Sequence, residues 1–303
     1  MGRTLTVITA ALMLGLMPPA AAGAHEGGHS HYTQGVKDTI WQDSMNVFRR
    51  HEAPSKEMFE FYGKVLGLTQ LQTFDVKGAN GANLVARFII GDSQVKFTER
   101  TDGRQYVDGG VKDATGLRLL SFFFDDEAAL SKRFTDHGLA APDFQTRDGR
   151  RSAFVDDPDG QPVELVIGGD VNGIEIGLTV SDMARSVDFY KHFVGLDTVG
   201  AFDDPVFGGK KISLRHGTTI VTLRSFGADL PKDTGSGGIQ YVVTDAARVA
   251  RVAAAEKVPV ESPLSTLEDF DLTTIWLDDP DGITNYFAQT SSATRAARSA
   301  RVQ

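Results

Sequence analysis

The chain contains no cysteine, and this absence removes several classes of protein. Disulfide crosslinks, thiolate nucleophiles, cysteine–zinc sites and lipoprotein anchors all require a thiol. Positive charge is also scarce, because 31 basic residues face 40 acidic ones and the formal net charge is −9. Such a chain is a poor ligand for nucleic acid or for an anionic membrane. We therefore expect its partner to be a small molecule.

Long apolar runs are absent, apart from one near the amino terminus. Arg3 precedes an apolar stretch over residues 4–17, which two prolines and the small residues 22–24 follow. A run of about 14 residues is too short to span a membrane but is typical of a secretory signal. We expect residues 1–24 to be a signal peptide and the protein to be exported, to the periplasm or the medium. Residues 25–39 should form a flexible His-rich segment, whose possible metal binding at His25 stays open, and 291–303 a flexible tail.

Common catalytic sequence motifs are missing as well. The chain has no Gly-x-Ser-x-Gly elbow, no P-loop and no His-Glu-x-x-His. It has an internal repeat instead. Phe-Tyr-Gly-Lys-Val-Leu-Gly-Leu at 61–68 returns as Phe-Tyr-Lys-His-Phe-Val-Gly-Leu at 189–196, and Val-Asp-Asp-Pro-Asp-Gly at 155–160 returns as Leu-Asp-Asp-Pro-Asp-Gly at 277–282. Two unrelated words that recur at nearly the same spacing indicate a duplicated half-chain of about 125 residues.

Each half contains one pattern twice, a strand, a helix and further strands. Apolar alternation and capping residues predict helices at 55–67, 126–137, 182–195 and 245–257. Strands are predicted at 84–90, 94–98, 118–124, 174–180, 211–214, 219–223, 239–243, 273–277 and 284–288, and near Ala153 and Val163. We therefore predict an α+β chain of four βαβββ modules, two in a domain at 40–168 and two in a domain at 172–290.

These modules, with Phe-Tyr-x-x-x-x-Gly-Leu in helices and Asp-Pro-Asp-Gly before closing strands, resemble the vicinal oxygen chelate superfamily. That superfamily includes glyoxalase I, extradiol dioxygenases and bleomycin-resistance proteins. The resemblance covers about residues 40–290 and implies two eight-stranded, sheet-lined cups, each built from two modules. Modules could pair one with two and three with four, or one with four and two with three. The resemblance implies no single activity, because the superfamily spans several reactions and pure binders.

The resemblance also implies where a metal ion would lie. Metal-dependent members carry His or Glu on a module's opening strand and Glu on its closing strand. The opening positions here are Val47, Leu119, Glu175 and Gly238, and the closing positions are Thr98, Glu164, Arg224 and Tyr286. Only Glu164 and Glu175 are good ligands, and only the second pairing brings them together. We therefore predict no metal cofactor. Gly238 should leave open room in its cup.

Strand alternation selects the inward residues. If Ile176, Leu178 and Val180 pack on the helix, Glu175 and Thr179 face the cup. Arg224 has the same inward parity, so we predict that Glu175 and Arg224 face one cup and touch each other or a shared ligand, as a stiffening salt bridge or as a ligand site. 

The predicted catalytic residues are Glu164, Glu175, Arg224 and Tyr286. Glu164 or Glu175 would be the general base, with a pKa raised by burial, and Tyr286 or Arg224 would stabilise negative charge. The predicted substrate-binding residues are His51, Thr179 and Gln240.

The leading prediction is a metal-independent lyase, isomerase or hydrolase that acts on a small organic molecule, as a monomer or homodimer. One rival is a non-catalytic protein that sequesters its ligand. Another is a metal-dependent dioxygenase or glyoxalase. An apolar cup without a buried acid would favour the binder, and a perturbed acid beside a donor would favour the enzyme.

Overall fold

The computed structural model describes residues 30–78, 81–100 and 103–292. The predicted signal peptide, His25 and most of the carboxyl-terminal tail lie outside these residues. Among the described residues, no helix has the length and apolar character needed to cross a membrane.

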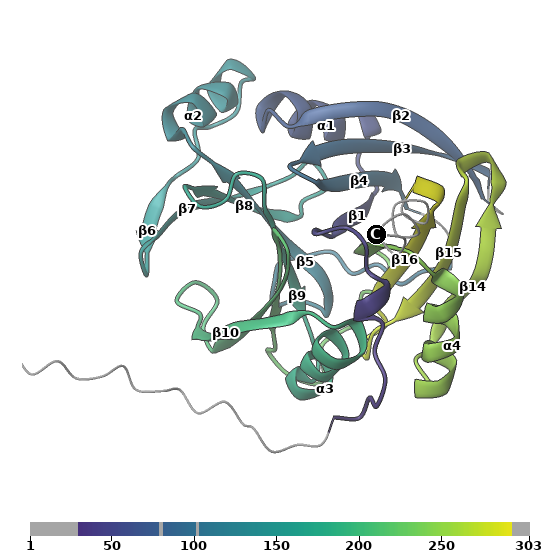
Figure 1. Cartoon of the computed structure of the whole chain (residues 1–303). Helices are drawn as coiled ribbons and strands as arrows, with labels where there is room; N and C mark the ends of the chain where they lie inside the picture. The colour runs from purple at the N-terminus through teal and green to yellow at the C-terminus, as the bar shows by residue number, and fades with distance from the viewer. Residues whose placement is uncertain (1–29, 79–80, 101–102, 293–303) are drawn as a thin grey trace, which may run out of the picture.

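Two curved eight-stranded sheets make up the molecule (Figure 1). We call them sheet A and sheet B. Sheet A has the order β14-β15-β16-β13-β1-β4-β3-β2, and sheet B the order β10-β11-β12-β9-β5-β8-β7-β6. Sheet A contains β1 (Asn46–His51), β2 (Thr69–Gly78), β3 (Gly81–Ile90), β4 (Ser93–Glu99), β13 (Gly237–Val243), β14 (Val260–Leu267), β15 (Leu272–Asp278) and β16 (Thr284–Thr290). Sheet B contains β5 (Gly116–Phe124), β6 (Gln145–Arg147), β7 (Arg150–Asp156), β8 (Pro162–Ile167), β9 (Ile174–Thr179), β10 (Asp197–Asp203), β11 (Lys210–His216) and β12 (Thr219–Arg224).

Each sheet takes one module from each half of the chain. Modules one and four form sheet A, and modules two and three form sheet B. The opening strands meet at the centre of each sheet, where β1 pairs antiparallel with β13 and β5 with β9. Within a module the opening strand pairs parallel with the closing one, as β9 does with β12. The predicted fold of four βαβββ modules in two cups is confirmed, and the pairing is the second of the two alternatives.

The helices cover the outer faces of the sheets (Figure 1). They are α1 (Ser55–Glu60) with its π-helical continuation η2 (Phe61–Val65), α2 (Glu127–Asp136), α3 (Met183–Asp188) with the π-helical η3 (Phe189–Val194), and α4 (Ala246–Glu256). Two short 3₁₀ turns, η1 (Lys37–Thr39) and η4 (Glu268–Phe270), complete the elements. Ile176, Leu178 and Val180 are buried in the apolar core, as the alternation predicted. The opposite strand faces line the cups.

The two repeated sequence motifs contact each other: each Phe-Tyr motif contacts an Asp-Pro-Asp-Gly turn. The Tyr62 hydroxyl of η2 donates to the Asp157 carboxylate at 2.8 Å, and Tyr190 of η3 donates to Asp279 at 3.0 Å. Asp159, in the same turn as Asp157, accepts the backbone N–H groups that precede α1. Each Asp-Pro-Asp-Gly turn therefore fastens its module to the helix of the preceding module, in the other sheet. The repeated words are structural and hold the two cups together.

Residues 30–39, part of the segment predicted to be flexible, lie against the helices of the second half. The Ser30 hydroxyl donates to Asp188 at 2.7 Å, and Thr33 donates to Glu256. The Tyr32 ring packs on Phe189 with a centroid distance of 6.1 Å. These contacts tie the start of the described chain to α3 and α4.

Candidate functional site

The cup of sheet B holds the two carboxylates that the sequence singled out. Glu164 on β8 and Glu175 on β9 lie on either side of Ser121 on β5, which is register-paired with both. They line a cavity of about 270 Å³. Both side chains are only 7% exposed. Only the pairing of modules two and three could bring these residues together.

One guanidinium joins the two carboxylates. Arg150, at the start of β7, donates through Nε and Nη2 to Glu164 at 3.1 and 2.7 Å, and through Nη1 to Glu175 at 2.9 Å. Its Cζ lies 5.5 Å from the centre of the Phe123 ring. The Ser121 hydroxyl adds a bond to Glu164 at 2.7 Å. The charged groups of this cluster therefore bond to one another, and the guanidinium lies between the two carboxylates.

The electrostatics of this cluster contradict the predicted general base. Burial acts to raise the pKa of Glu175, but the charge of Arg150 and hydrogen bonds from Thr222 and Arg150 outweigh it. The net result is a lowered pKa for Glu175. A carboxylate that holds its charge this firmly is a weak base, so the prediction of a raised pKa at Glu175 is wrong.

Arg224 and Glu175 line the same cavity, as predicted. Of the two predicted contacts, the direct pair is absent, and the contact through a shared ligand stays a prediction. The Nε of Arg224 donates to Asp204 at 2.7 Å, and its Cζ lies 5.2 Å from the centre of the Phe207 ring. Asp204 comes from the loop between β10 and β11, which sequence alternation could not place. Arg224 Nη1 is buried and has no hydrogen-bond partner among the described residues.

The cup of sheet A differs in character. Its cavity has a volume of about 310 Å³ and is walled by aromatic rings on several strands. Trp276 on β15 lies between Phe48 and Tyr286, with centroid distances of 6.1 and 4.9 Å. Phe74 and Phe270 face each other at the outer side, 5.3 Å apart. No aspartate or glutamate is among the described residues that line this cavity.

Tyr286 and Gln240 both lie in the sheet A cup. They are register partners on β16 and β13, so their placement in a cup agrees with the prediction. Tyr286 is nevertheless in a different cup from Glu164 and Glu175, and the predicted cooperation between them is wrong. Burial raises the pKa of Tyr286, which keeps its hydroxyl neutral. The Gln240 side-chain oxygen accepts a hydrogen bond from Lys96.

Gly238 does not leave open room. A Cβ at this position would lie 2.3 Å from the Thr284 carbonyl oxygen and 2.6 Å from the Phe48 ring. The missing side chain is therefore what lets Phe48 lie across the strand. Phe48 is also the register partner of Gly238, so it is the inward residue of β1. Val47, the position inferred for a ligand, is buried in the core on the other face.

Thr179 and His51 do not line either cup cavity. The Thr179 hydroxyl donates to the Val111 carbonyl at 2.6 Å and is fully buried, so it holds the loop before β5. His51 shares the face of Val47 rather than that of Phe48, and its Nδ1 lies 2.8 Å from the Ala53 carbonyl oxygen. Both side chains already bond to backbone carbonyl groups outside the cup cavities, and substrate binding by these two residues stays a prediction.

The four positions inferred for a metal ion in each cup carry residues that do not fit one. In the sheet B cup they carry Leu119, Glu164, Glu175 and Arg224, and Arg150 already satisfies both carboxylates. In the sheet A cup the inferred positions are Val47, Thr98, Gly238 and Tyr286, which include no carboxylate or imidazole, and Val47 faces the core. Within the described chain, no three His, Asp or Glu residues converge as a metal site would require.

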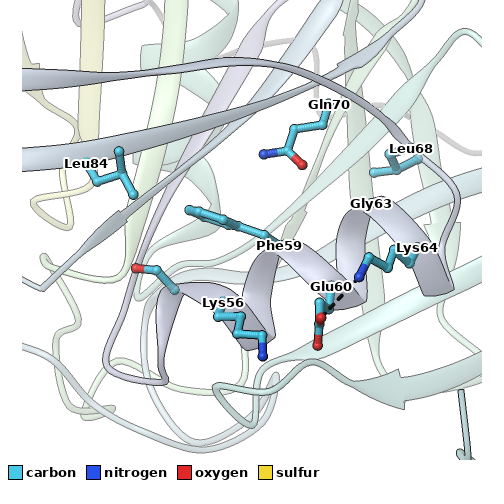
Figure 2. Close-up of a pocket in the computed structure, with 9 residues that line it drawn as sticks. Lys56, Phe59, Glu60, Gly63, Lys64, Leu68, Gln70 and Leu84 are labelled. Atoms are coloured by element: carbon cyan, nitrogen blue, oxygen red, sulfur yellow. Dashed lines mark hydrogen bonds and ion pairs between the residues drawn. The ribbon is translucent and has the colours of Figure 1, made fainter.

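A third hollow lies outside both cups, between α1, η2 and the strands β2 and β3 (Figure 2). Its volume is about 570 Å³. Phe59 points across it toward Leu84, while Lys64 turns aside to pair with Glu60 at 3.1 Å. It contains none of the predicted site residues and no converging set of buried polar groups. The two cups are therefore the candidate sites.

Sequence reasoning missed the cations that define both cups. Arg150 begins β7, and no motif marks it. Lys96 was within reach, because it lies two residues before Thr98 on a predicted strand and so shares its inward face. The aromatic residue Trp276 was also on a predicted strand.

Two cups of paired βαβββ modules define the class of protein by fold. The sequence model of the Glyoxalase/Bleomycin resistance protein/Dioxygenase superfamily matches the chain twice, at residues 55–165 and 174–287. The chain therefore belongs to that superfamily.

Similar solved structures agree with this class. Glyoxalase I from Zea mays has a TM-score of 0.66 and 18% identity, covering 86% of this chain and 95% of that chain. A putative dioxygenase from Bacillus subtilis has a TM-score of 0.58 and 17% identity, covering 84% of this chain and 86% of that one. No curated protein sequence matches. Likeness at these identities concerns the fold alone.

Proposed function

We propose that this protein binds and sequesters a small organic molecule in the sheet A cup, without a metal ion and without transforming the ligand. The observation that carries the proposal is an aromatic cavity of about 310 Å³ with no carboxylate among its described lining residues. Ligand pockets are mostly apolar with a few polar groups that orient the ligand, and this cup has that composition.

Catalysis is the weaker alternative because neither cup offers a free acid or base of the kind predicted. Glu164 and Glu175 are bonded to Arg150, and the pKa of Glu175 is lowered. The signal-like first 24 residues support export as part of the proposal, since a secreted binder would meet its ligand outside the cell.

A neutral fluorescent probe tests the proposal. The chain has two tryptophans, and Trp41 is on the surface whereas Trp276 walls the cup. In a Trp41→Phe variant, bound N-phenyl-1-naphthylamine should receive excitation energy from Trp276 and saturate at one site per chain. The matched Trp276→Phe variant should lose this transfer. Absence of any saturable probe binding to the folded protein would refute the proposal.

A further inference from the structure

The sheet A cup contains positive charge that no described acid neutralises. Lys96 on β4 and Arg50 on β1 line the cavity, and neither forms an ion pair among the described residues. Lys96 donates to Gln240, and Arg50 Nη1 donates to the Gly235 carbonyl at 2.8 Å. Both cations therefore donate hydrogen bonds to neutral acceptors.

A third cation lies next to them. Arg87 on β3 is the register partner of Lys96, its Nη2 donates to the Gln72 carbonyl at 2.8 Å, and its Cζ lies 4.7 Å from the centre of the Phe74 ring. Three adjacent strands thus carry like charges on one sheet. Like charges on neighbouring strands repel each other, so this arrangement costs stability unless an anion lies among them.

Several other arginines that are buried or partly buried have carboxylate partners. Arg150 has Glu164 and Glu175, Arg224 has Asp204, and Arg118 has Asp233 at 2.8 Å. Arg104, at the edge of the sheet A cup, pairs with Glu261. In a chain of net charge −9, Lys96 and Arg50 thus lack the carboxylate that Arg150, Arg224, Arg118 and Arg104 have, although Arg49, buried on the core face of β1, also forms no ion pair among the described residues.

We infer that the sheet A cup takes an aromatic carboxylate, with the carboxylate at Lys96 and Arg50 and the ring against Phe48, Trp276 and Tyr286. The inference rests on the proposed function and adds the ligand's charge to it. Lys96 is opposite Phe48 in the register, and Arg50 is two residues further along the same face of β1. One carboxylate could therefore receive hydrogen bonds from both while its ring meets the aromatic wall. Thr98, whose buried hydroxyl has no partner among the described residues, lines the same cavity.

The charge state of Lys96 makes the binding pH-dependent. Burial, with a smaller effect from Arg87, lowers the pKa of Lys96 to about 8. The groups that face it from the other strands are Arg50, Arg87, Gln240 and Tyr286, with Arg104 beyond. Burial and the charge of Arg104 also lower the pKa of Arg50, to about 9, while burial raises the pKa of Tyr286, so the cup loses positive charge between pH 7 and 10.

Calorimetric titration of the protein with 2-naphthoate and with 2-naphthamide tests the inference, because the two probes share one ring system and differ in charge. At pH 7 we expect naphthoate to bind at least about tenfold more tightly, which is about 1.4 kcal/mol. The preference should fall in Lys96→Met, return in Lys96→Arg, and weaken in the unmodified protein at pH 10.

The outcomes separate this inference from the proposed function. Equal affinities for the two probes, or a preference that neither Lys96→Met nor pH 10 changes, would overturn the inference and leave the binding function standing. Failure of naphthoate, naphthamide and the neutral naphthylamine alike would overturn the binding function, and the ligand class with it. The titration of the unmodified protein against pH needs no variant to fold.

Discussion

Replacing Arg150 by methionine tests whether one guanidinium stabilises the two buried carboxylates of the sheet B cup. Methionine keeps much of the side chain's apolar length and removes its charge. Glu164 and Glu175 would then remain only 7% exposed without their cation. Removing one partner of a fully buried ion pair costs about 3–5 kcal/mol. The Arg150 side chain is 31% exposed, so solvent screening reduces the expected loss to about 2–3 kcal/mol at pH 7.

The loss should depend on pH in a defined direction. In the unmodified protein the pKa of Glu175 is lowered, so the stability from its ionised form is present above the unfolded pKa of about 4.3 and is lost as the pH falls below it. In Arg150→Met, only the Thr222 hydrogen bond and the charge of Arg224 still oppose burial, so the pKa of Glu175 should rise. Ionising it then costs stability as the pH rises. The difference between the two proteins should therefore be larger at pH 7 than at pH 4.

Urea unfolding followed by circular dichroism at pH 4, 5.5 and 7 measures this difference. Arg151→Met is a matched control, because this neighbouring arginine pairs with Glu127 in a more exposed position, and its loss should change stability little. Adding Glu164→Gln and Glu175→Gln to Arg150→Met should restore much of the stability. A difference that is constant with pH, or one no larger than that of the control, would refute the explanation.

Three further predictions follow from the geometry. Arg150→His would place a third ligand beside Glu164 and Glu175, so calorimetry should detect tighter zinc or nickel binding than in the unmodified protein. No gain would show that the carboxylates cannot converge on an ion. Burial raises the pKa of Asp279 from 3.8 to about 7, so its ionisation costs stability as the pH rises. In thermal melts, the stability of Asp279→Asn relative to the unmodified protein should therefore be greater at pH 8 than at pH 5. An equal difference at the two pH values would contradict this. Gly238→Ala should destabilise the protein by about 1–3 kcal/mol in urea, because its Cβ would meet backbone and the Phe48 ring; an unchanged midpoint would show that the strand can shift.

The aromatic cup and the charge cluster were only partly predictable. Glu164, Glu175, Gln240 and Tyr286 could be placed on inward faces, because alternation along a strand is a local property. Their partners could not be identified, since Arg150 and Lys96 reach them across neighbouring strands. An ionisable residue's pKa depends on those partners, which is why the raised pKa expected for Glu175 was wrong.

The sequence by itself determined the four modules and their strand faces. Its repeated words and apolar alternation are local patterns, and the strands with one buried face were found. The strands that it missed, β2, β6, β10 and β14, are the four edges of the two sheets. β10 and β14 are mostly exposed along their length, so no alternation marks them.

Only the tertiary structure decided which modules share a cup. All four modules carry the same strand and helix pattern, so local periodicity cannot distinguish one pairing from another. The choice depends on contacts between residues far apart in the chain, such as Tyr62 with Asp157 and Phe48 with Gly238. The pairing of modules two and three places both glutamates beside Arg150. The pairing of modules one and four places Lys96 and Arg50 among aromatic rings. Both results depend on packing between residues that are far apart in the chain.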